Sequence, residues 1–398
     1  MKLIKRYFLI FTAALMTLLP ACHKNEPELT VITHDTDVSA SEDVSDEISE
    51  TEIRIPEGMV TRYASLDFDK RMQEAYDGIV DTITGYEKKS LIPLTVSTKD
   101  YSKILGIVRC EQLAFFYLEN RTVGDYNSAA QTFEMDFQYK YTIKEVNTML
   151  RQTEEEAKKI IALTDDSMSD YEKLKLFHDY LVRNVESSVD SEHADSIYGA
   201  LVEKQALCEG YAKAFSYLCN LSGIENMIVT GFTEIDHMWN MVKLDGKWYH
   251  IDIGWDKPAE ALTARCPDMV LYQYFLASDS VIQNDHRSIS RSLGDPPAAD
   301  SDDMSYFVHE GKYAHNYDEA LAMIEDTCRS CIDSGQKYFM IKLDSSNLYL
   351  STLNELTRPS DDEGNSDIRA VADRLGYKGN ISYTDYYKNY RILIFILD

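Results

Sequence analysis

The sequence predicts an α+β protein in which a helix packs on a small antiparallel sheet. Three observations carry this prediction. A stripe of apolar residues at helical spacing follows Cys208 and consists of Tyr211, Ala214, Phe215 and Leu218. Two strand-like stretches, 238–244 and 247–253, flank the turn signal Asp245-Gly246. Helix and strand patterns then alternate in a separate stretch after residue 303.

The first 22 residues are typical of an export signal. A basic start that ends at Arg6 precedes an apolar run over 7–19, which is too short to span a membrane. The run ends in Leu19-Pro20-Ala21-Cys22, which resembles a bacterial lipobox. We therefore expect lipidation at Cys22 and a protein anchored to the extracytoplasmic face of a bacterial membrane. The alternative is an ordinary signal peptide that is cleaved at Ala21.

The next segment, 23–55, is predicted to be a disordered acidic tether. Between residues 25 and 53 it holds ten acidic side chains and no lysine, arginine or aromatic residue. The whole chain has a formal net charge of −27, which argues against nucleic acid as a partner. We expect contact with the membrane through the lipid anchor alone.

Composition and periodicity divide the remaining chain further. Residues 56–145 mix helix and strand signals and form a predicted accessory α/β region. Residues 146–290 form the predicted core domain. In it, a helix from Ser169 to Val185 carries His178 along its apolar side, where we expect a buried, hydrogen-bonded histidine. Residues 291–303 are rich in serine, aspartate and proline and are predicted to be a linker.

Residues 304–398 are predicted to form a small ferredoxin-like α+β module, because strand and helix patterns alternate twice. Cys328 and Cys331 share a helical apolar stripe, so we interpret them as core thiols. The predicted order is strand Ser305–Glu310, helix Tyr317–Asp333, strand Tyr338–Leu343, a loop, helix Ser366–Leu375, and strands Asn380–Tyr383 and Arg391–Leu397.

Cys208 lies at or just before the first turn of the helix that the apolar stripe predicts. Free backbone N–H groups and the positive end of the helix dipole at such a position favour a thiolate and could hold an oxyanion. A thiolate is a strong nucleophile, so Cys208 is a candidate catalytic residue. The plainer interpretation is a small buried cysteine.

The predicted hairpin places a histidine near an aspartate. If Asp245-Gly246 forms the turn, Trp239 faces Asp252, and His237 lies on the same sheet face one pair away on the diagonal. That diagonal is about 7–8 Å between backbones, which two side chains can bridge. A slip of one residue would put them on opposite faces. The spacing thus predicts an aspartate that orients a histidine, but it does not predict a contact with Cys208.

Three motifs resemble the transglutaminase-like superfamily over roughly residues 165–258. They are Cys-x-Gly-Tyr-Ala from Cys208, His-x-Trp-Asn from His237 and Trp-Tyr-x-x-Asp ending at Asp252. The resemblance implies a papain-like core in which these three residues form a triad for acyl transfer or amide hydrolysis, without a cofactor. It also implies that Cys208 and His237 meet. The family often has Gly-Val where this chain has Ala206-Leu207, which bears on the oxyanion site.

The same resemblance suggests supporting residues. Trp239 and Asn240 match the family motif and are candidates to orient or cover the imidazole, with hairpin packing as the alternative. Tyr198 is a candidate oxyanion donor, with core packing as the alternative. The candidates to line a substrate cleft are Glu209, Tyr211, Trp255 and Asp256.

A metal site is the other chemical interpretation of the hairpin. Asp236, His237, His250 and Asp252 are close in the sequence, and such residues ligate zinc. No Cys-x-x-Cys or His-Glu-x-x-His spacing accompanies them. We therefore expect no metal and interpret His250 as a supporting or structural residue.

The sequence as a whole predicts an exported, membrane-anchored thiol enzyme that acts on peptide or carboxamide bonds through Cys208, His237 and Asp252. Its substrates are expected to be proteins or peptides, with cell-wall peptides suggested by the anchor. The alternative is a non-catalytic binding protein at the cell surface that keeps the fold and the cleft.

Overall fold

A computed structural model describes residues 8–9, 49–93, 96–119, 123–127, 132–287, 289, 294–358, 367–384 and 387–398. The expected signal peptide, apart from residues 8–9, lies outside these described residues, and so do Cys22 and the tether up to residue 48. In the described part of the chain, no helix is long and apolar enough to cross a membrane.

The end of the predicted tether packs against helix α3 (Ile143–Ile161), which corrects its expected boundary. Asn147 of α3 accepts a hydrogen bond from the Arg54 amide at 2.8 Å and donates to backbone carbonyls of the same segment. Ile53 is buried. Residues 49–55 are therefore part of the folded protein.

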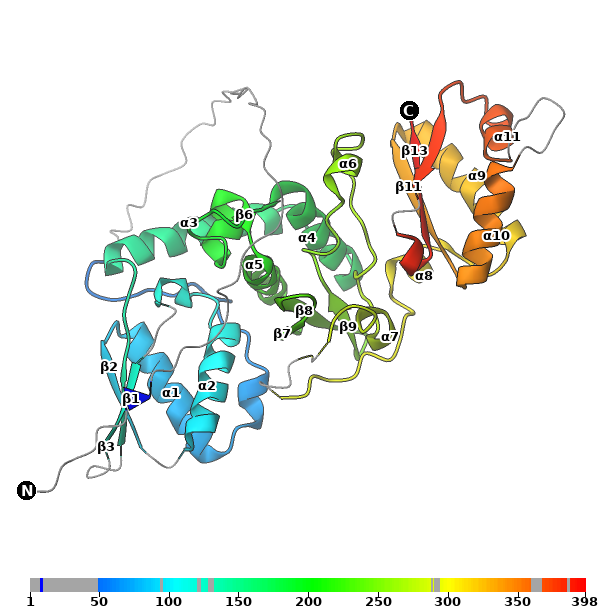
Figure 1. The fold of residues 1–398 in the computed structure, drawn as a ribbon. Coiled ribbons are helices and arrows are strands. Elements are labelled where there is room, and N and C mark those ends of the chain that lie inside the picture. Colours follow the sequence, from blue (N-terminus) through cyan, green and yellow to red (C-terminus); the bar gives the residue numbers. More distant parts are fainter. Residues whose placement is uncertain are drawn as a thin grey trace, which may run out of the picture.

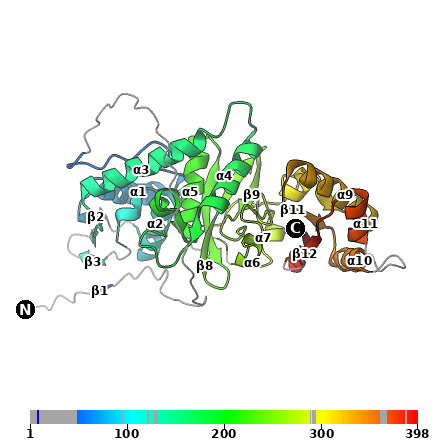
Figure 2. The same ribbon diagram turned by 90° about the horizontal axis from the view of Figure 1, so that it is seen from above.

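The chain folds into an N-terminal, a central and a C-terminal part, which follow one another in space in the same order as in the sequence (Figures 1 and 2). The N-terminal part has an antiparallel sheet of strand order β1-β3-β4-β2 with helices α1 and α2 beside it. Its elements are β1 (Phe8–Leu9), η1 (Ala64–Asp67), α1 (Lys70–Thr84), β2 (Lys89–Pro93), α2 (Thr98–Glu111), η2 (Phe115–Tyr117), β3 (Val123–Asn127) and β4 (Thr132–Asp136).

The central part surrounds one helix, α5 (Cys208–Leu221), which contacts strands β7 and β8 and helices α3 and α4 (Figures 1 and 2). All side chains from Glu209 to Cys219 are buried, so this helix has no solvent face. The other elements are α4 (Asp170–Asn184), β5 (Glu186–Ser187), the π-helix η3 (Gly199–Glu203), β6 (Gln205–Ala206), β7 (Asn226–Phe232), β8 (Asp236–Leu244), β9 (Lys247–Ile251), α6 (Glu260–Thr263) and α7 (Asp279–Ile282).

The predicted α4 is confirmed, together with the state of its histidine. Ser169 caps the helix and forms a capping box with Glu172, as a serine three residues before a glutamate predicts. His178 is fully buried and lies within hydrogen-bonding distance of Asp179 and Asp256. It is thus the satisfied core histidine that the sequence predicts.

The predicted hairpin is also confirmed. Strands β7, β8 and β9 form an antiparallel sheet with β8 in the middle. Leu244 pairs with Lys247 and Val242 with Tyr249, so the register is the expected one. Asp245 and Gly246 both have positive φ, as a tight two-residue turn requires.

The segment predicted as a linker packs against this hairpin in the described residues 294–303. Ala299 is fully buried, and its amide lies 3.1 Å from the carboxylate of Asp279. Asp303 forms an ion pair with Lys247 at 2.5 Å and accepts a hydrogen bond from the Tyr249 hydroxyl. The described residues of the predicted linker therefore pack on the central part as they connect it to the C-terminal part.

The C-terminal part is an α/β module whose topology differs from the prediction. Strand β10 lies directly beside β11 and parallel to it, in a sheet of order β10-β11-β13-β12. A ferredoxin-like split βαβ unit would place another strand between them, so that expectation is wrong. The elements are α8 (Tyr306–His309), β10 (Tyr313–Ala314), α9 (Tyr317–Ser334), β11 (Tyr338–Leu343), α10 (Ser346–Thr357), α11 (Asp367–Arg374), β12 (Ile381–Thr384), η4 (Lys388–Tyr390) and β13 (Ile392–Leu397).

Two local predictions in this module are corrected. Residues 305–310, predicted as a strand, form the helical turn α8, in which Tyr306 stacks on Tyr272 of the central part at 3.8 Å between ring centroids. The predicted loop after β11 contains helix α10, which Ser345 caps. The core thiols are confirmed, because Cys328 and Cys331 are buried in α9.

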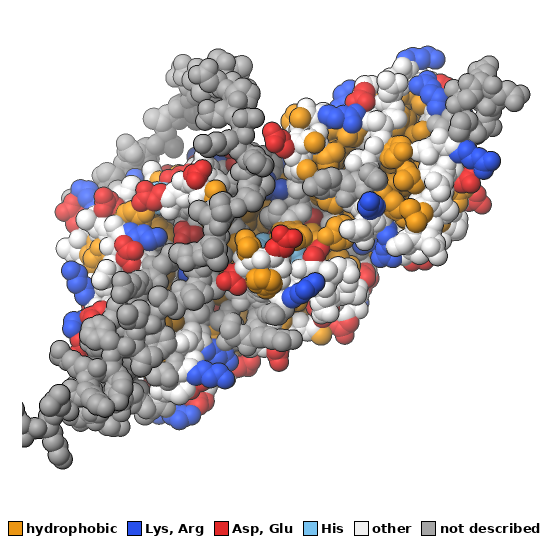
Figure 3. All heavy atoms as spheres, in the orientation of Figure 1, with side chains coloured by type: hydrophobic (Ala, Val, Ile, Leu, Met, Phe, Trp, Pro, Cys, Tyr) orange, Lys and Arg blue, Asp and Glu red, His pale blue; other side chains and the backbone are white. Residues whose placement is uncertain are grey.

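One face of the C-terminal sheet packs against the central part. Tyr338 of β11 donates to the Asp268 carbonyl and accepts from the Val270 amide at 3.1 Å, and Ile394 of β13 is fully buried. Figure 3 shows apolar side chains gathered on the C-terminal part of the face in view, with acidic and basic side chains spread over the other parts. The C-terminal module is therefore joined to the central part through side-chain contacts as well as through the chain.

Candidate active site

Cys208 is the first residue of α5 and is half-buried. The helix start is held close to a neighbouring segment, since the Leu207 amide donates to the Ala194 carbonyl at 2.7 Å. A β-carbon on Gly210 would lie only 2.5 Å from the same carbonyl oxygen, so the motif glycine permits this approach. The N-cap residue Leu207 makes no side-chain hydrogen bond to α5, and first-turn N–H groups without such a cap can receive an anionic oxygen.

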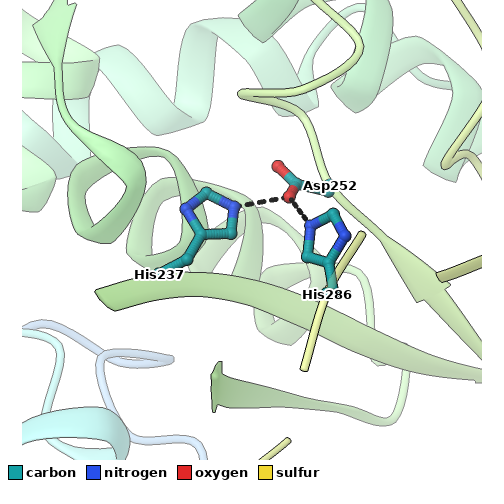
Figure 4. A group of neighbouring side chains, drawn as sticks. All are labelled: His237, Asp252 and His286. Carbon is teal, nitrogen blue, oxygen red and sulfur yellow. Dashed lines mark hydrogen bonds and ion pairs between the residues drawn. The ribbon is translucent and has the colours of Figure 1, made fainter. Parts of the chain in front are cut away.

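His237 and Asp252 meet at the end of the hairpin, as the register predicts. The Nε2 atom of His237 lies 2.6 Å from Oδ2 of Asp252, and both side chains are buried (Figure 4). The backbone amide of Trp255 donates to Oδ1 of the same carboxylate at 3.1 Å. Asp252 thereby fixes which ring nitrogen of His237 is left for another partner.

Cys208 lies close enough to the His237 ring to contribute to its electrostatics. Burial by itself lowers the pKa of His237, but the charge of Asp252 and hydrogen bonds with Asp252 and Cys208 outweigh it and raise the pKa to about 10. Burial likewise opposes the charge of Asp252, yet its two histidine neighbours hold the pKa of the carboxyl well below its usual range. The imidazole thus stays protonated between a carboxylate and a thiol, which is the arrangement that stabilises a thiolate.

Comparison with known protein families agrees with this geometry. Residues 158–253 match the sequence model of the family described as the transglutaminase-like superfamily. This range contains Cys208, His237 and Asp252. The chain contains a transglutaminase-like domain.

The curated relatives are much longer than the matched segment. Human kyphoscoliosis peptidase is 30% identical over 93 residues, which cover 20% of this chain and 14% of the relative. The mouse protein of the same name is 24% identical over 143 residues, which cover 31% of this chain and 22% of the relative. The chain therefore spans less than a quarter of the length of these relatives.

The similarity to solved structures also extends over only about a third of this chain. A crystal structure of a TGase is 15% identical, with a TM-score of 0.25, and the match covers 34% of this chain and 43% of that one. The periplasmic domain of TgpA from Pseudomonas aeruginosa, bound to ethylmercury, is 14% identical, with a TM-score of 0.22, and covers 33% and 59%.

A second histidine, which the sequence did not single out, lies beside the pair of His237 and Asp252. Nε2 of His286 is 2.9 Å from the same Oδ2 atom of Asp252 that His237 contacts (Figure 4). His286 comes from the irregular segment after α7, where no periodic pattern marks it. The only signal in the sequence is the neighbouring pair Asp285-His286.

Two tryptophans pack around the imidazole of His237. Trp239 stacks on His237 with 5.7 Å between centroids and a 20° interplanar angle, and Trp255 lies 6.1 Å from it. The Trp239 N–H donates to Nδ1 of His250 at 3.1 Å, and Nε2 of His250 faces Asp279 at 2.9 Å. Trp239 thus covers the imidazole as expected, and His250 supports it from behind.

The other two supporting candidates face elsewhere. Asn240 is almost fully buried and donates to the Ala212 carbonyl and the Ser216 hydroxyl, so it ties β8 to α5 instead of orienting His237. The Tyr198 hydroxyl donates to Gln152 at 3.3 Å. Both expectations are therefore corrected, and for Tyr198 the packing alternative is the better description.

Three of the four cleft candidates belong to the interior of the transglutaminase-like domain. The carboxylate of Glu209 forms a buried ion network with Arg109 at 2.6 Å and Lys213 at 2.7 Å. The Tyr211 hydroxyl donates to the Val185 carbonyl at 2.6 Å. Asp256 is fully buried, where it accepts from the Tyr274 amide and faces His178. These assignments are corrected, and Trp255 alone stays beside the triad.

Asp256 differs electrostatically from Asp252. Burial raises the pKa of Asp256 to about 6, and its bonds to His178 and the Tyr274 amide only partly offset this effect. Asp252 instead has two histidine partners that hold its charge. The surroundings thus favour the ionised form of Asp252 more strongly than that of Asp256.

One group in the described chain has the composition of a metal site. Donor atoms of His237, Asp252 and His286 lie within 4.8 Å of one another. His250, part of the metal alternative considered from the sequence, bonds to Trp239 and Asp279 instead. Both histidine nitrogens point at one carboxylate oxygen at hydrogen-bond distances, and this arrangement needs no ion to account for it.

Proposed function

We propose that the protein is a thiol enzyme that transfers acyl groups from peptide or carboxamide bonds through Cys208, His237 and Asp252. One observation supports this most directly: His237 lies between the buried carboxylate and the cysteine at the start of α5. The transglutaminase-like match over 158–253 and the curated relatives named as peptidases support it further.

The proposed reaction has two halves. The Cys208 sulfur attacks the carbonyl carbon, and the carbonyl electrons move onto oxygen, which the first-turn N–H groups of α5 receive. When the C–N bond breaks, the His237 imidazolium gives its proton to the departing nitrogen and a thioester is left. Water or an amine then attacks the thioester, gives a proton back to His237 and releases the thiolate. Asp252 keeps the imidazole oriented throughout.

The reactivity of Cys208 tests this proposal. At pH 6.5 iodoacetamide should alkylate Cys208 about 100-fold faster than an ordinary thiol. The thiolate is the reactive form, and only about 1% of an ordinary thiol is thiolate at that pH. Burial raises the pKa of Cys110 to about 12 and that of Cys331 to about 11, so these residues serve as internal references in peptide mapping by mass spectrometry. His237→Ala should remove the advantage. Uniform slow labelling would instead favour the binding protein that keeps the fold without turnover.

A second assay defines the acceptor. Incubation with a peptide library and a tagged amine separates cleavage or deamidation, which need water, from incorporation of the amine. We propose peptides or exported proteins, including cell-wall peptides, as substrates. A product in either arm supports the enzyme, and no product with any substrate argues against it.

We also propose that the protein is exported and anchored through a lipid on Cys22. The basic start, the short apolar run and the lipobox-like end of residues 1–22 support this. Cells fed an alkyne-tagged fatty acid should label the wild-type protein, and Cys22→Ala should lose both the label and the membrane association. Equal labelling of the two proteins would contradict the anchor.

A further inference from the structure

His286 lies between two carboxylates. Its Nε2 atom is 2.9 Å from Oδ2 of Asp252, and its Nδ1 atom is 2.5 Å from Oδ1 of Asp285. The side chain is buried, with a relative exposure of 1%. Both ring nitrogens therefore have a carboxylate oxygen as their partner, and the ring is shielded from bulk water.

This geometry fixes the charge of the ring. A neutral imidazole has one N–H and one lone pair, so one of the two contacts would place a lone pair against a carboxylate oxygen. Both contacts are favourable only if His286 carries two N–H groups and a positive charge. Burial opposes that charge, but the hydrogen bonds to Asp252 and Asp285 outweigh it and raise the pKa of His286.

The network continues into the C-terminal part. The second oxygen of Asp285, Oδ2, accepts a hydrogen bond from the Tyr274 hydroxyl at 2.6 Å and another from the Tyr390 hydroxyl. Tyr390 belongs to η4, just before the central strand β13 of the C-terminal sheet. Asp285 thus accepts hydrogen bonds from three donors, and one of them, Tyr390, belongs to the C-terminal module.

We propose that His286 is a positioning residue of the active site, a fixed imidazolium that shares Asp252 with His237 and is held in place by Asp285, Tyr274 and Tyr390. This inference rests on the proposed function. Charges then alternate along the row from the Cys208 thiolate through His237, Asp252 and His286 to Asp285. The positive charge of His286 weakens the hold of Asp252 on the His237 proton, so that His237 can release this proton to a leaving amine.

The surroundings of His286 contain few other titratable groups. His237 is 5.4 Å away between centroids, and Tyr274 packs on the ring at 5.2 Å. His250 interacts only weakly with His286. Burial lowers the pKa of His250, which favours its neutral form. The remaining ring contacts are uncharged and come from Trp239 and Trp255. His286 is thus the positively charged group closest to Asp252 on the side away from His237.

The pH dependence of Cys208 alkylation in the full chain tests the proposal. We expect two inflections in this rate, which belong to the coupled pair of Cys208 and His237, because alkylation needs the thiolate and its reactivity depends on the His237 proton. His286→Gln keeps an N–H donor for Asp252 but removes the positive charge. Without that charge the thiol ionises less readily and His237 holds its proton more tightly. Both inflections should therefore rise, by about one pH unit.

The direction in which the upper inflection shifts in His286→Gln distinguishes this positioning role from a purely structural one. If His286→Gln only loosened the site, Cys208 and His237 would uncouple, and the upper inflection would fall while the lower one rose. Asp285→Asn provides a second route, because an amide partner lets His286 become neutral without leaving its place. It should reproduce the upward shift, and the double variant should shift no further.

Three results would overturn the proposal. If the inflections are unchanged in both variants while wild-type Cys208 is alkylated rapidly below pH 7, the role of His286 is refuted and the proposed function stands. Slow wild-type alkylation would sink the proposed function and this inference together. One equivalent of zinc in the purified protein, lost in His286→Gln, would mean that the ring nitrogens are metal ligands instead of donors to Asp252.

Discussion

Asparagine in place of Asp252 is expected to lower kcat about 10⁴-fold while the fold persists. Oδ2 of Asp252 receives both His237 and His286 at 2.6 and 2.9 Å, and an amide cannot neutralise either imidazolium. A neutral amide also leaves the His237 ring free to adopt the tautomer with its proton on the wrong nitrogen. The thiolate of Cys208 then loses its counter-ion, and the leaving amine loses its acid. Steady-state kinetics on a peptide substrate, together with alkylation at pH 6.5, measure the loss.

Glu203→Gln is the matched reference for this substitution. Glu203 also pairs with a histidine, His193 at 2.7 Å, but in an exposed pair outside the triad. The same carboxylate-to-amide change there should alter kcat less than threefold. If Asp252→Asn kept a tenth or more of wild-type kcat with an intact thermal transition, Asp252 would not be the residue that orients His237.

Leucine in place of Glu209 is expected to destabilise the protein by about 3–5 kcal/mol. Glu209 is 2% exposed, and its carboxylate neutralises Lys213, which is 4% exposed, as well as Arg109 of α2. Leucine fits the volume but leaves a buried ammonium group and a half-buried guanidinium without a counter-charge. Urea unfolding at pH 7 measures the loss. Glu155→Leu, which removes an exposed pair with Arg151 on α3, should cost less than about 1 kcal/mol.

The cost of losing Glu209 should depend on pH in one direction. Burial opposes its charge, but Lys213 and Arg109 lower the pKa of Glu209 from 4.5 to about 2 in the folded protein. A carboxyl whose pKa is lower when folded stabilises the protein above its unfolded pKa and loses that contribution as the pH falls towards the folded value. The difference between wild type and Glu209→Leu should therefore shrink between pH 4.5 and pH 2. A difference that grew in this range would contradict the ion network.

The parts of the site that follow local rules could be predicted. The Asp245-Gly246 turn and the two-residue period of a strand determine which side chains of the hairpin face each other, and they bring His237 to Asp252. Contacts between distant segments could not be predicted from spacing. His286 reaches Asp252 from an irregular stretch whose path depends on packing against Trp239 and Trp255.

The burial of helix α5 could be predicted only in part from the sequence. Its apolar stripe predicted a helix with one buried face, and the structure buries every side from Glu209 to Cys219. Charged residues on such a helix look like a solvent face in sequence, and only the opposing Arg109 reveals that Glu209 and Lys213 form an interior network. Glu209, which the family resemblance suggested as a residue of the cleft, belongs to this network instead.

In the C-terminal module tertiary contacts overrode local propensity. The stretch Tyr306-Phe307-Val308 has the β-branched and aromatic composition of a strand, yet it forms a helical turn in which Tyr306 stacks on Tyr272 and Phe307 is buried. Helix α10 did carry a signal, because Tyr349, Thr352 and Leu356 follow the cap at Ser345 with helical spacing. The polar run before it favoured a loop.

The pairing of Arg109 with Glu209 has a practical consequence for anyone who trims this protein. The family match covers 158–253, but cutting there would remove the guanidinium that faces the residue next to Cys208, and cutting before residue 390 would take a donor from Asp285. A fragment that starts before Arg109 and ends after Tyr390 keeps both contacts.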